Sequence, residues 1–289
     1  MTRYLALDAF RGITIALMIL VNTPGSWAHV YAPLLHASWH GATPTDLVFP
    51  FFLFIIGSAM FFSFKKSNFS APSTQFLMIV RRGFIMFLIG LMLNVIPFDS
   101  PMEEWRIMGV LQRIGIAYVI AASLVMLLNR RGIFIISVII LLVYWGMLLS
   151  VGEAGFTIES NIIRQIDLAI LGANHMYSMH GIRFEPEGLL STLPAVVNVL
   201  LGFELTRYLT TIKNKSASVL KLMIIGGLAV GFAMLWSFIL PINKSLWTSS
   251  YVIYTTGFAC LLLAFFAWLN HQHHSRISMF SLNAAHEDQ

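Results

Sequence analysis

Long apolar runs separated by short polar gaps recur along this 289-residue chain and constrain its fold more than any other feature. The clearest runs cover residues 133–149 and 251–269, and neither contains a charged residue. A helix of about 20 apolar residues spans the hydrocarbon core of a bilayer and satisfies its own backbone polar groups there. These solid runs lack the alternating polarity of a transmembrane β-barrel. We therefore predict an all-α, polytopic transmembrane helix bundle.

About eight spans are expected in this bundle. They are placed at about residues 5–23, 45–64, 75–97, 107–128, 132–151, 188–208, 217–240 and 246–269. The composition agrees, because 57% of the residues are hydrophobic and 11% are charged, against roughly 25% charged residues in soluble domains. We interpret residues 1–270 as a single transmembrane domain with outer loops at about 24–44 and 152–187. A short polar tail is expected at 271–289.

The basic residues indicate an orientation rather than a nucleic-acid partner. The net charge is +5, but basic tracts interleaved with aromatic residues, which are typical of nucleic-acid binding, are absent. With the N-terminus in the cytoplasm, 12 Lys and Arg residues fall on the inner side and 5 on or near the outer side, while Arg11 lies inside the first helix. Such an excess on one side predicts a cytoplasmic N-terminus.

Several polar and small residues lie inside the apolar runs. Asp8 and Arg11 are three positions apart on one helix face, and so are Glu204 and Arg207, so each pair is expected to form an ion pair. Glycines at positions 227 and 231 form a small-xxx-small motif, which typically permits close helix packing. The single cysteine, at position 260, lies within an apolar run, which excludes an intrachain disulfide.

Residues 36–50, with the sequence HASWHGATPTDLVFP, carry the most informative polar side chains. Histidine acts as a base near neutral pH, and a carboxylate such as Asp46 can orient it and stabilise its protonated form. A simpler alternative is that His36 and His40 are solvated and that Asp46 only caps a helix. The two histidines are also spaced to share zinc, but no cysteine and only one carboxylate accompany them, so no metal site is predicted.

Two further features also point to the outer side. The loop at 152–187 is longer than a connection requires, and loops of this length are usually functional or disordered. It contains a possible interfacial helix at 162–171. Arg113 lies about six residues into its helix, ~9 Å from the helix start at 1.5 Å per residue. Because charged groups inside a membrane are costly and commonly functional, Arg113 is expected to extend outward or to contact an anionic ligand.

Five segments recur in the order of a known family over nearly the whole chain. They are residues 7–13 (LDAFRGI), 36–39 with 46–50 (HASW and DLVFP), 111–118 (LQRIGIAY), 186–194 (PEGLLSTLP) and 243–251 (NKSLWTSSY). In these segments the chain resembles the heparan-α-glucosaminide N-acetyltransferase family, which includes bacterial relatives linked to the use of N-acetylglucosamine.

The resemblance implies transfer of an acetyl group from cytosolic acetyl-CoA, as co-substrate, to a glucosamine-type amino sugar. The acceptor would lie on the periplasmic side of a bacterial inner membrane. The family's active-site histidine corresponds to His36, acting either as acetyl carrier or as general base, and Asp46 is its companion carboxylate. Substrate or cofactor binding is assigned to Asn22, Arg113, Asn243 and Trp247. Besides the amino sugar, the lipid bilayer is the expected partner, and a homodimer is possible.

Two alternatives stay open at this point. The intramembrane polar groups suggest a transporter for N-acetylglucosamine or related sugars, although we see no clear pair of discontinuous helices that would favour transport. In the family, further helices follow the segment at 243–251, so the resemblance implies a chain shortened at its C-terminal end with an open bundle. Such a chain could also be an inactive remnant.

Overall fold

The computed structural model describes residues 5–67, 69, 73–212 and 214–287, and over these residues the fold is helical. The helices are α1 (Leu5–Asn22), α2 (Val48–Lys66), α3 (Ser73–Val95), α4 (Val110–Leu127), α5 (Arg130–Leu149), α6 (Ile162–Leu171), α7 (Thr192–Thr211), α8 (Lys215–Trp236) and α9 (Ser249–Glu287). A two-stranded antiparallel hairpin pairs β1 (Ser178–Met179) with β2 (Ile182–Arg183). The predicted all-α class is confirmed, and the helix expected at 162–171 is α6.

Seven of these helices are long and apolar enough to cross a membrane. They are α1, α2, α3, α4, α5, α8 and α9. The eighth expected span is α7, which is helical over 20 residues but carries the polar residues Asn198, Glu204 and Arg207. It packs against α2, α4, α5 and α9, and most of its side chains are buried. A helix enclosed by others need not be as apolar as one that faces lipid, which explains the difference.

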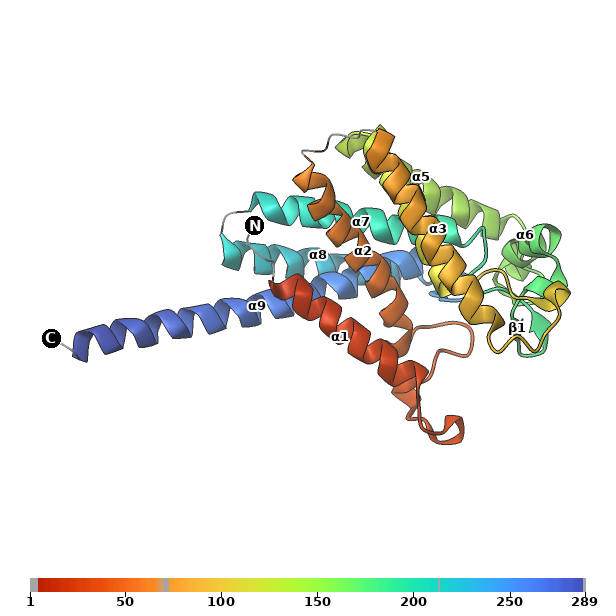
Figure 1. Ribbon diagram of the computed structural model, residues 1–289, viewed down its shortest axis with the longest axis horizontal. Helices are drawn as coiled ribbons and strands as arrows, with labels where there is room; N and C mark the ends of the chain where they lie inside the picture. The colour runs from red at the N-terminus through yellow and green to blue at the C-terminus, as the bar shows by residue number, and fades with distance from the viewer. Residues whose placement is uncertain (1–4, 68, 70–72, 213, 288–289) are drawn as a thin grey trace.

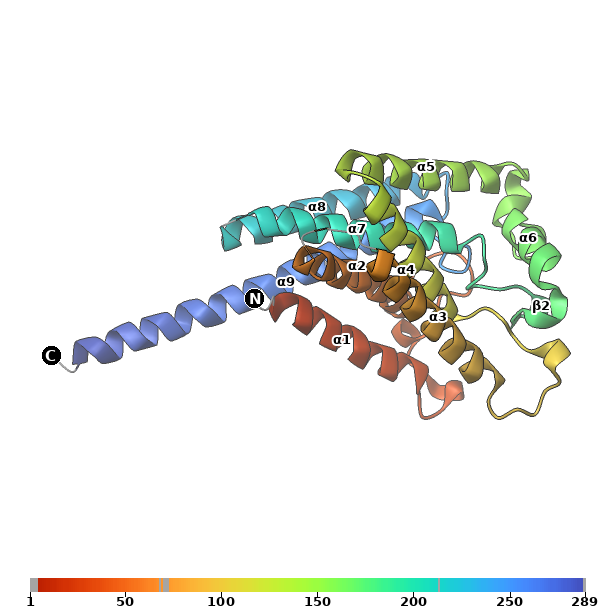
Figure 2. The ribbon, with the colours of Figure 1, turned by 45° about the horizontal axis from the view of Figure 1, so that its top comes forward.

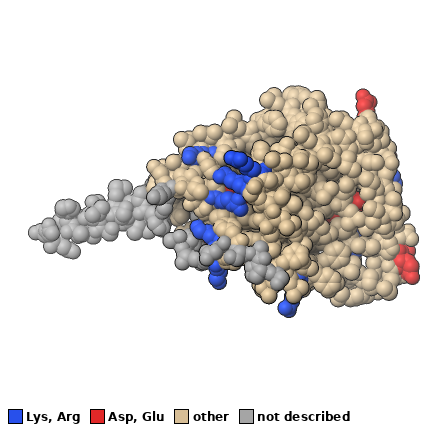
Figure 3. Space-filling view, turned by 90° about the horizontal axis from the view of Figure 1, so that it is seen from above, with Lys and Arg blue, Asp and Glu red and all other residues tan. Residues whose placement is uncertain are grey.

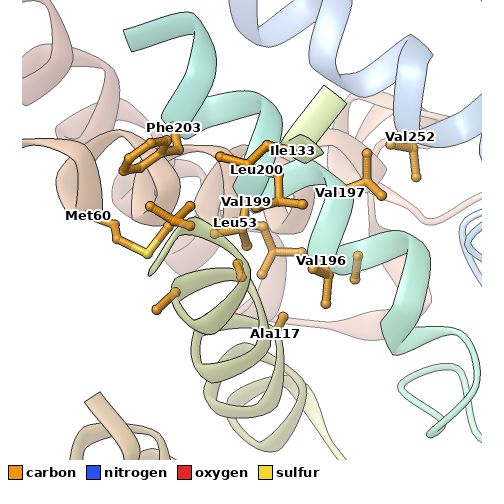
Figure 4. Packing of buried hydrophobic residues seen from close by; sticks show 14 of the residues in the cluster. Leu53, Met60, Ala117, Ile133, Val196, Val197, Val199, Leu200, Phe203 and Val252 are labelled. Carbon is orange, nitrogen blue, oxygen red and sulfur yellow. The ribbon is translucent and has the colours of Figure 1, made fainter. Parts of the chain in front are cut away.

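Helices α2 and α7 are in backbone contact at the centre of the bundle. A Cβ atom added at Gly57 would lie 1.9 Å from the carbonyl oxygen of Val199, and one added at Gly202 would lie 2.1 Å from that of Phe54. Small residues are therefore required on both helices. Figure 4 shows the surrounding core, in which Leu53 lies against side chains of α7.

The second close helix pair, α8 with α9, differs from the prediction. A Cβ atom added at Gly226 would lie 2.8 Å from the carbonyl oxygen of Gly257, so these two glycines form the contact. Gly227 and Gly231, the two glycines of the sequence motif, are exposed, and among the described residues no other helix has an atom within 4 Å of a Cβ atom added at either position. The expectation that they mediate packing within this chain is wrong, because the contact lies on the neighbouring face of α8.

The bundle has two distinct ends. The end that carries α6, the hairpin and the connecting segments 24–47, 96–109, 152–191 and 237–248 is called the outer end here (Figure 2). From the opposite, inner end α9 extends beyond the other helices, so the segment expected as a polar tail continues as helix to Glu287 (Figure 1). Lys and Arg side chains gather near the inner end, and Asp and Glu side chains are seen toward the outer end (Figure 3).

The two expected helical ion pairs are present. Arg11 Nη1 lies 3.9 Å from Asp8 Oδ1 in α1. Arg207 Nη1 lies 2.9 Å from Glu204 Oε1 near the inner end of α7, and Arg130 Nε approaches the other oxygen of Glu204 at 3.6 Å. The acidic residues Asp8 and Glu204 of these helices are thus paired with arginines.

Candidate functional site at the outer end

Asp46 organises the start of α2 and holds His36 at the same time. It lies in the turn Pro44–Leu47 with its side chain 1% exposed. Its Oδ2 accepts hydrogen bonds from the backbone N–H groups of Ala37 at 3.0 Å and Thr43 at 2.9 Å. Its Oδ1 lies 2.7 Å from Nδ1 of His36. The capping role and the histidine-orienting role, which the sequence presented as alternatives, coexist in one carboxylate.

The pairing determines which atom of His36 can react. Since a carboxylate only accepts hydrogen bonds, Nδ1 of His36 is the donor and the neutral ring keeps its lone pair on Nε2. The imidazole is 50% exposed, whereas its carboxylate partner is buried. A half-exposed imidazole whose Nδ1 is held by a carboxylate is the arrangement used for general-base and nucleophilic catalysis.

Lys244 completes a three-residue cluster that the sequence analysis did not identify. Its Nζ lies 3.0 Å from Nδ1 and 3.4 Å from Nε2 of His36, and 3.5 Å from Oδ1 of Asp46. Burial lowers the pKa of Lys244, and the negative charges of Asp46 and Glu187 oppose this shift. The only signal in the sequence was its position inside the segment 243–251, directly after Asn243.

Asn243 fixes the loop that carries Lys244. It is fully buried, its Oδ1 accepts a hydrogen bond from Leu246 N at 2.8 Å, and its Nδ2 lies 3.3 Å from Nδ1 of His40. The backbone N–H of Gly41 donates to the carbonyl oxygen of Ile242 at 2.7 Å. Burial lowers the pKa of His40, which favours the neutral ring that accepts from the amide. Residues 241–248 are thereby held against residues 40–43, beside His36.

Trp247 belongs to the same loop and has a strained backbone conformation. Its φ is +51°, in the left-handed region that non-glycine residues rarely adopt and that commonly marks functional sites. The indole is fully buried and donates from Nε1 to Oδ1 of Asn198 at 3.0 Å. Its ring contacts Tyr251, whose hydroxyl donates to the backbone carbonyl oxygen of Asp46 at 2.5 Å. Trp247 therefore connects the core of the bundle to the His36 cluster.

Arg113 packs over the ring of Trp247 and is fully buried. Its guanidinium carbon is 4.7 Å from the centre of the indole ring. Its Nη2 donates to the carbonyl oxygen of Pro186 at 2.7 Å and to the hydroxyl of Ser191, whereas Nε and Nη1 have no hydrogen-bond partner among the described residues. A buried cation with unsatisfied donors is costly unless a ligand completes it. Arg113 thus fits an anionic or carbonyl oxygen.

A second charged cluster lies nearby, and its arginine pairs with its two glutamates. Arg106 Nε donates to Glu185 Oε2 at 2.9 Å, and its Nη2 donates to Glu187 Oε2 at 2.8 Å. Both carboxylates are largely buried. The sequence analysis did not predict this cluster, although Glu187 lies in the segment 186–194, and the mutual pairing is a product of the fold.

Asn22 is the predicted site residue that the structure does not place in the cluster. It ends α1, is exposed, and donates from Nδ2 to the carbonyl oxygen of Met18 at 2.8 Å within its own helix. Its assignment to substrate binding stays a prediction. His36, Asp46, Asn243, Trp247 and Arg113 are brought together.

Comparison with known proteins shows the family of the chain. The family profile described as heparan-α-glucosaminide N-acetyltransferase, catalytic, matches residues 3–230. Heparan-α-glucosaminide N-acetyltransferase from Homo sapiens is 28% identical over 320 aligned positions, and the Mus musculus protein is 27% identical. Each alignment covers 90% of this chain and 48% of the relative, so the chain spans about half the length of these curated relatives. Because the profile match covers most of its length, the chain belongs to the heparan-α-glucosaminide N-acetyltransferase family.

Proposed function

We propose that this chain is a transmembrane N-acetyltransferase that moves the acetyl group of acetyl-CoA to the amino group of a glucosamine-type sugar. The observation that carries the proposal is the His36–Asp46 pair, in which a buried carboxylate 2.7 Å from Nδ1 orients a half-exposed imidazole. Family membership supports the reaction class.

In this proposal Nε2 of His36 performs the proton or acetyl transfer. As a general base it removes a proton from the attacking amine while donor and acceptor are both bound. As a nucleophile it accepts the acetyl group first and passes it to the amine. Asp46 has the same task in both routes, because it holds the reactive tautomer and stabilises positive charge on the ring.

The surrounding residues are proposed to bind the two substrates. The unsatisfied N–H groups of Arg113 suit an oxygen of the donor, and the buried indole of Trp247 packs against this guanidinium and is proposed to hold it in the binding position. Asn243 acts by fixing the loop at 241–248. Asn22 is retained as a binding candidate at the outer end of α1.

The distribution of charge supports the direction of transfer. Basic side chains at the inner end (Figure 3) would sit at the cytoplasmic face of a bacterial inner membrane and attract the phosphate groups of acetyl-CoA. The His36 cluster would then face the periplasm, where the acceptor sugar arrives.

The test uses the full chain in proteoliposomes with acetyl-labelled CoA and glucosamine. Label is expected in the sugar with the wild-type chain and with His29→Ala, which removes an exposed histidine of the same outer loop. Label is expected to fall at least 10²-fold with His36→Ala, in line with the usual contribution of a general base. Equal labelling by both variants would reject the role of His36. Sugar flux without any acetylation would reject the enzyme in favour of a transporter.

A further inference from the structure

Lys244 lies closer to the imidazole of His36 than to the carboxylate of Asp46. Its Nζ is 3.0 Å from Nδ1 and 3.4 Å from Nε2 of His36, but 3.5 Å from Oδ1 of Asp46. Asp46 already accepts hydrogen bonds from Ala37, Thr43 and His36, so it does not depend on an ammonium group to satisfy its oxygens. Lys244 balances the buried charge of Asp46, and its shorter distances to His36 indicate a role in addition to this ion pair.

We propose that Lys244 is a catalytic residue whose ammonium group binds the carbonyl oxygen of the acetyl group and stabilises the oxyanion that forms on it. The proposal rests on the proposed acetyl transfer and adds the residue that stabilises its transition state. Preorganised donors aimed at developing negative charge usually make the largest single contribution to acyl transfer.

The position of Nζ suits this role. When Nε2 of His36 attacks, the carbonyl oxygen is separated from it only by the carbonyl carbon, so a donor 3.4 Å from Nε2 is within reach of that oxygen. If His36 acts as a base instead, the amine lies next to Nε2 and the acetyl carbonyl lies one atom further away, still near the ammonium group of Lys244. One ammonium group serves both routes.

The bonds and charges balance in either case. The lone pair of the attacking nitrogen forms the N–C bond, and the π pair of the carbonyl moves onto the oxygen, where Lys244 meets the negative charge. When that pair returns, the C–S bond breaks and its electrons leave with the sulfur as CoA thiolate. In the direct route the proton of the amine passes to Nε2 of His36. In the two-step route Nδ1 of His36 keeps its proton, shared with Asp46, throughout. When the amine takes the acetyl group, the bond between the acetyl carbon and Nε2 breaks, its electron pair returns to Nε2, and Nε2 accepts the proton that the amine releases.

The loop keeps the ammonium group in place before substrate binds. The side chain of Lys244 is 20% exposed. The hydrogen bonds of Asn243 to Leu246 and of Gly41 to Ile242 fix the backbone on which it is carried. The charged and titratable groups that face it are His36, Asp46, Glu187 and Arg113. The negative charges of Asp46 and Glu187 balance the positive charges of Lys244 and Arg113. The ammonium group of Lys244 therefore remains protonated although burial lowers its pKa.

The test compares Lys244→Met and Lys244→Arg with Arg183→Met, a control at an exposed basic residue of β2. Lys244→Met is expected to lower kcat by about 10²–10³-fold, with little change in KM for glucosamine. It should also remove the loss of activity at high pH that deprotonation of Lys244 produces in the wild-type chain. Lys244→Arg should recover part of kcat because a guanidinium group keeps the charge. Arg183→Met should match the wild-type chain.

A second measurement is independent of turnover. The infrared stretch of a ¹³C-labelled acetyl thioester carbonyl should shift to lower frequency on binding to the wild-type chain and to His36→Ala, and the shift should be lost in Lys244→Met. If the wild-type chain acetylates glucosamine but Lys244→Met keeps its kcat and the carbonyl shift, the assignment of Lys244 is overturned while the proposed function stands. If the wild-type chain does not acetylate, the proposed function fails, and the role of Lys244 fails with it.

Discussion

The two charged clusters at the outer end use similar side chains in different ways. In the first, His36, Asp46 and Lys244 leave an imidazole half exposed, with an ammonium group beside it. In the second, Arg106 directs its donors to the two largely buried carboxylates of Glu185 and Glu187. A network whose donors and acceptors are matched within the protein holds segments together, whereas one that presents a reactive nitrogen toward solvent is suited to chemistry. This comparison can be tested one cluster at a time.

The largest effect is expected for Asp46→Asn. An amide can donate to Nδ1 of His36, which would favour the wrong tautomer and place the proton on Nε2. We expect kcat to fall about 10³-fold, or about 4 kcal/mol in the activation free energy, with the folded state retained because the amide oxygen can still accept from Ala37 and Thr43. Initial rates and thermal unfolding in detergent measure the two quantities.

The control for this variant is Asp99→Asn, which changes an exposed outer carboxylate. It should leave both the rate and the unfolding temperature unchanged. Activity of Asp46→Asn within a few-fold of wild type would show that the carboxylate only caps α2 and would remove the distinction between the clusters.

The second cluster is expected to affect stability rather than chemistry. Glu185→Ala leaves the guanidinium of Arg106 without its principal partner, and breaking a buried pair typically costs about 3–5 kcal/mol of unfolding free energy. We expect a lower unfolding temperature and, in the fraction that remains folded, kcat within about tenfold of wild type. The double variant Arg106→Met/Glu185→Met should recover much of the lost stability, since no unpaired charge remains.

A result in which Glu185→Ala unfolds no earlier but loses catalysis would reverse the assignment. It would place the second cluster in the chemistry and make its carboxylates candidates for binding the ammonium form of the acceptor.

Replacing Asp167 in α6 is expected to have an intermediate effect, on stability, because neither cluster neutralises its carboxylate. It is buried, and its Oδ1 accepts a hydrogen bond from Leu189 N at 3.0 Å. Burial raises its pKa from 3.8 to about 6, although the backbone N–H groups of Leu189 and Leu190 and the charge of Arg113 act in the opposite direction. Between these pH values the native state binds more protons than the unfolded state, so stability decreases as the pH rises from about 4 to about 6.

At pH 7 the ionised Asp167 is expected to cost up to about 3 kcal/mol, at 1.36 kcal/mol for each pKa unit. Asp167→Asn cannot ionise, so it should unfold at a higher temperature than wild type at pH 7 and at nearly the same temperature near pH 4. Thermal unfolding of both proteins across this pH range checks the sign. Parallel curves for the two proteins would show that the group ionises normally in the folded state.

Much of the fold could be predicted from the sequence, because bilayer thickness fixes the length of an apolar helix. All eight expected spans are helical, and the expected helix at 162–171 coincides with α6. The contact between α8 and α9 could not be predicted, since a motif with correct spacing at Gly227 and Gly231 does not say which face of the helix has a neighbour. The contact at Gly226 and Gly257 depends on how both helices are rotated.

The contacts of the site also fall into those that local sequence could predict and those that it could not. His36 and Asp46 are ten positions apart in a single loop, so local sequence was enough to pair them. Lys244 is 208 positions from His36, and Arg106 is 79 positions from Glu185. Contacts over such separations depend on how complete helices pack, and one sequence contains no direct signal for them. The segment 243–251 marked the right loop but not the residue in it that reaches His36.

The smallest effect is expected for His40→Asn and sharpens the contrast between the two histidines of the loop. His40 accepts from the amide of Asn243 at 3.3 Å and, with a pKa lowered by burial, stays neutral. An asparagine oxygen can take over this acceptor role, so at most one ordinary hydrogen bond, about 1 kcal/mol, is lost. We expect kcat to fall no more than about fivefold with an unchanged pH profile, whereas His36→Asn should lower kcat by about 10²-fold, as for His36→Ala. If the two variants were equally impaired, both imidazoles would take part in the reaction, and the loop would present a histidine pair rather than one histidine supported by Asp46 and Lys244.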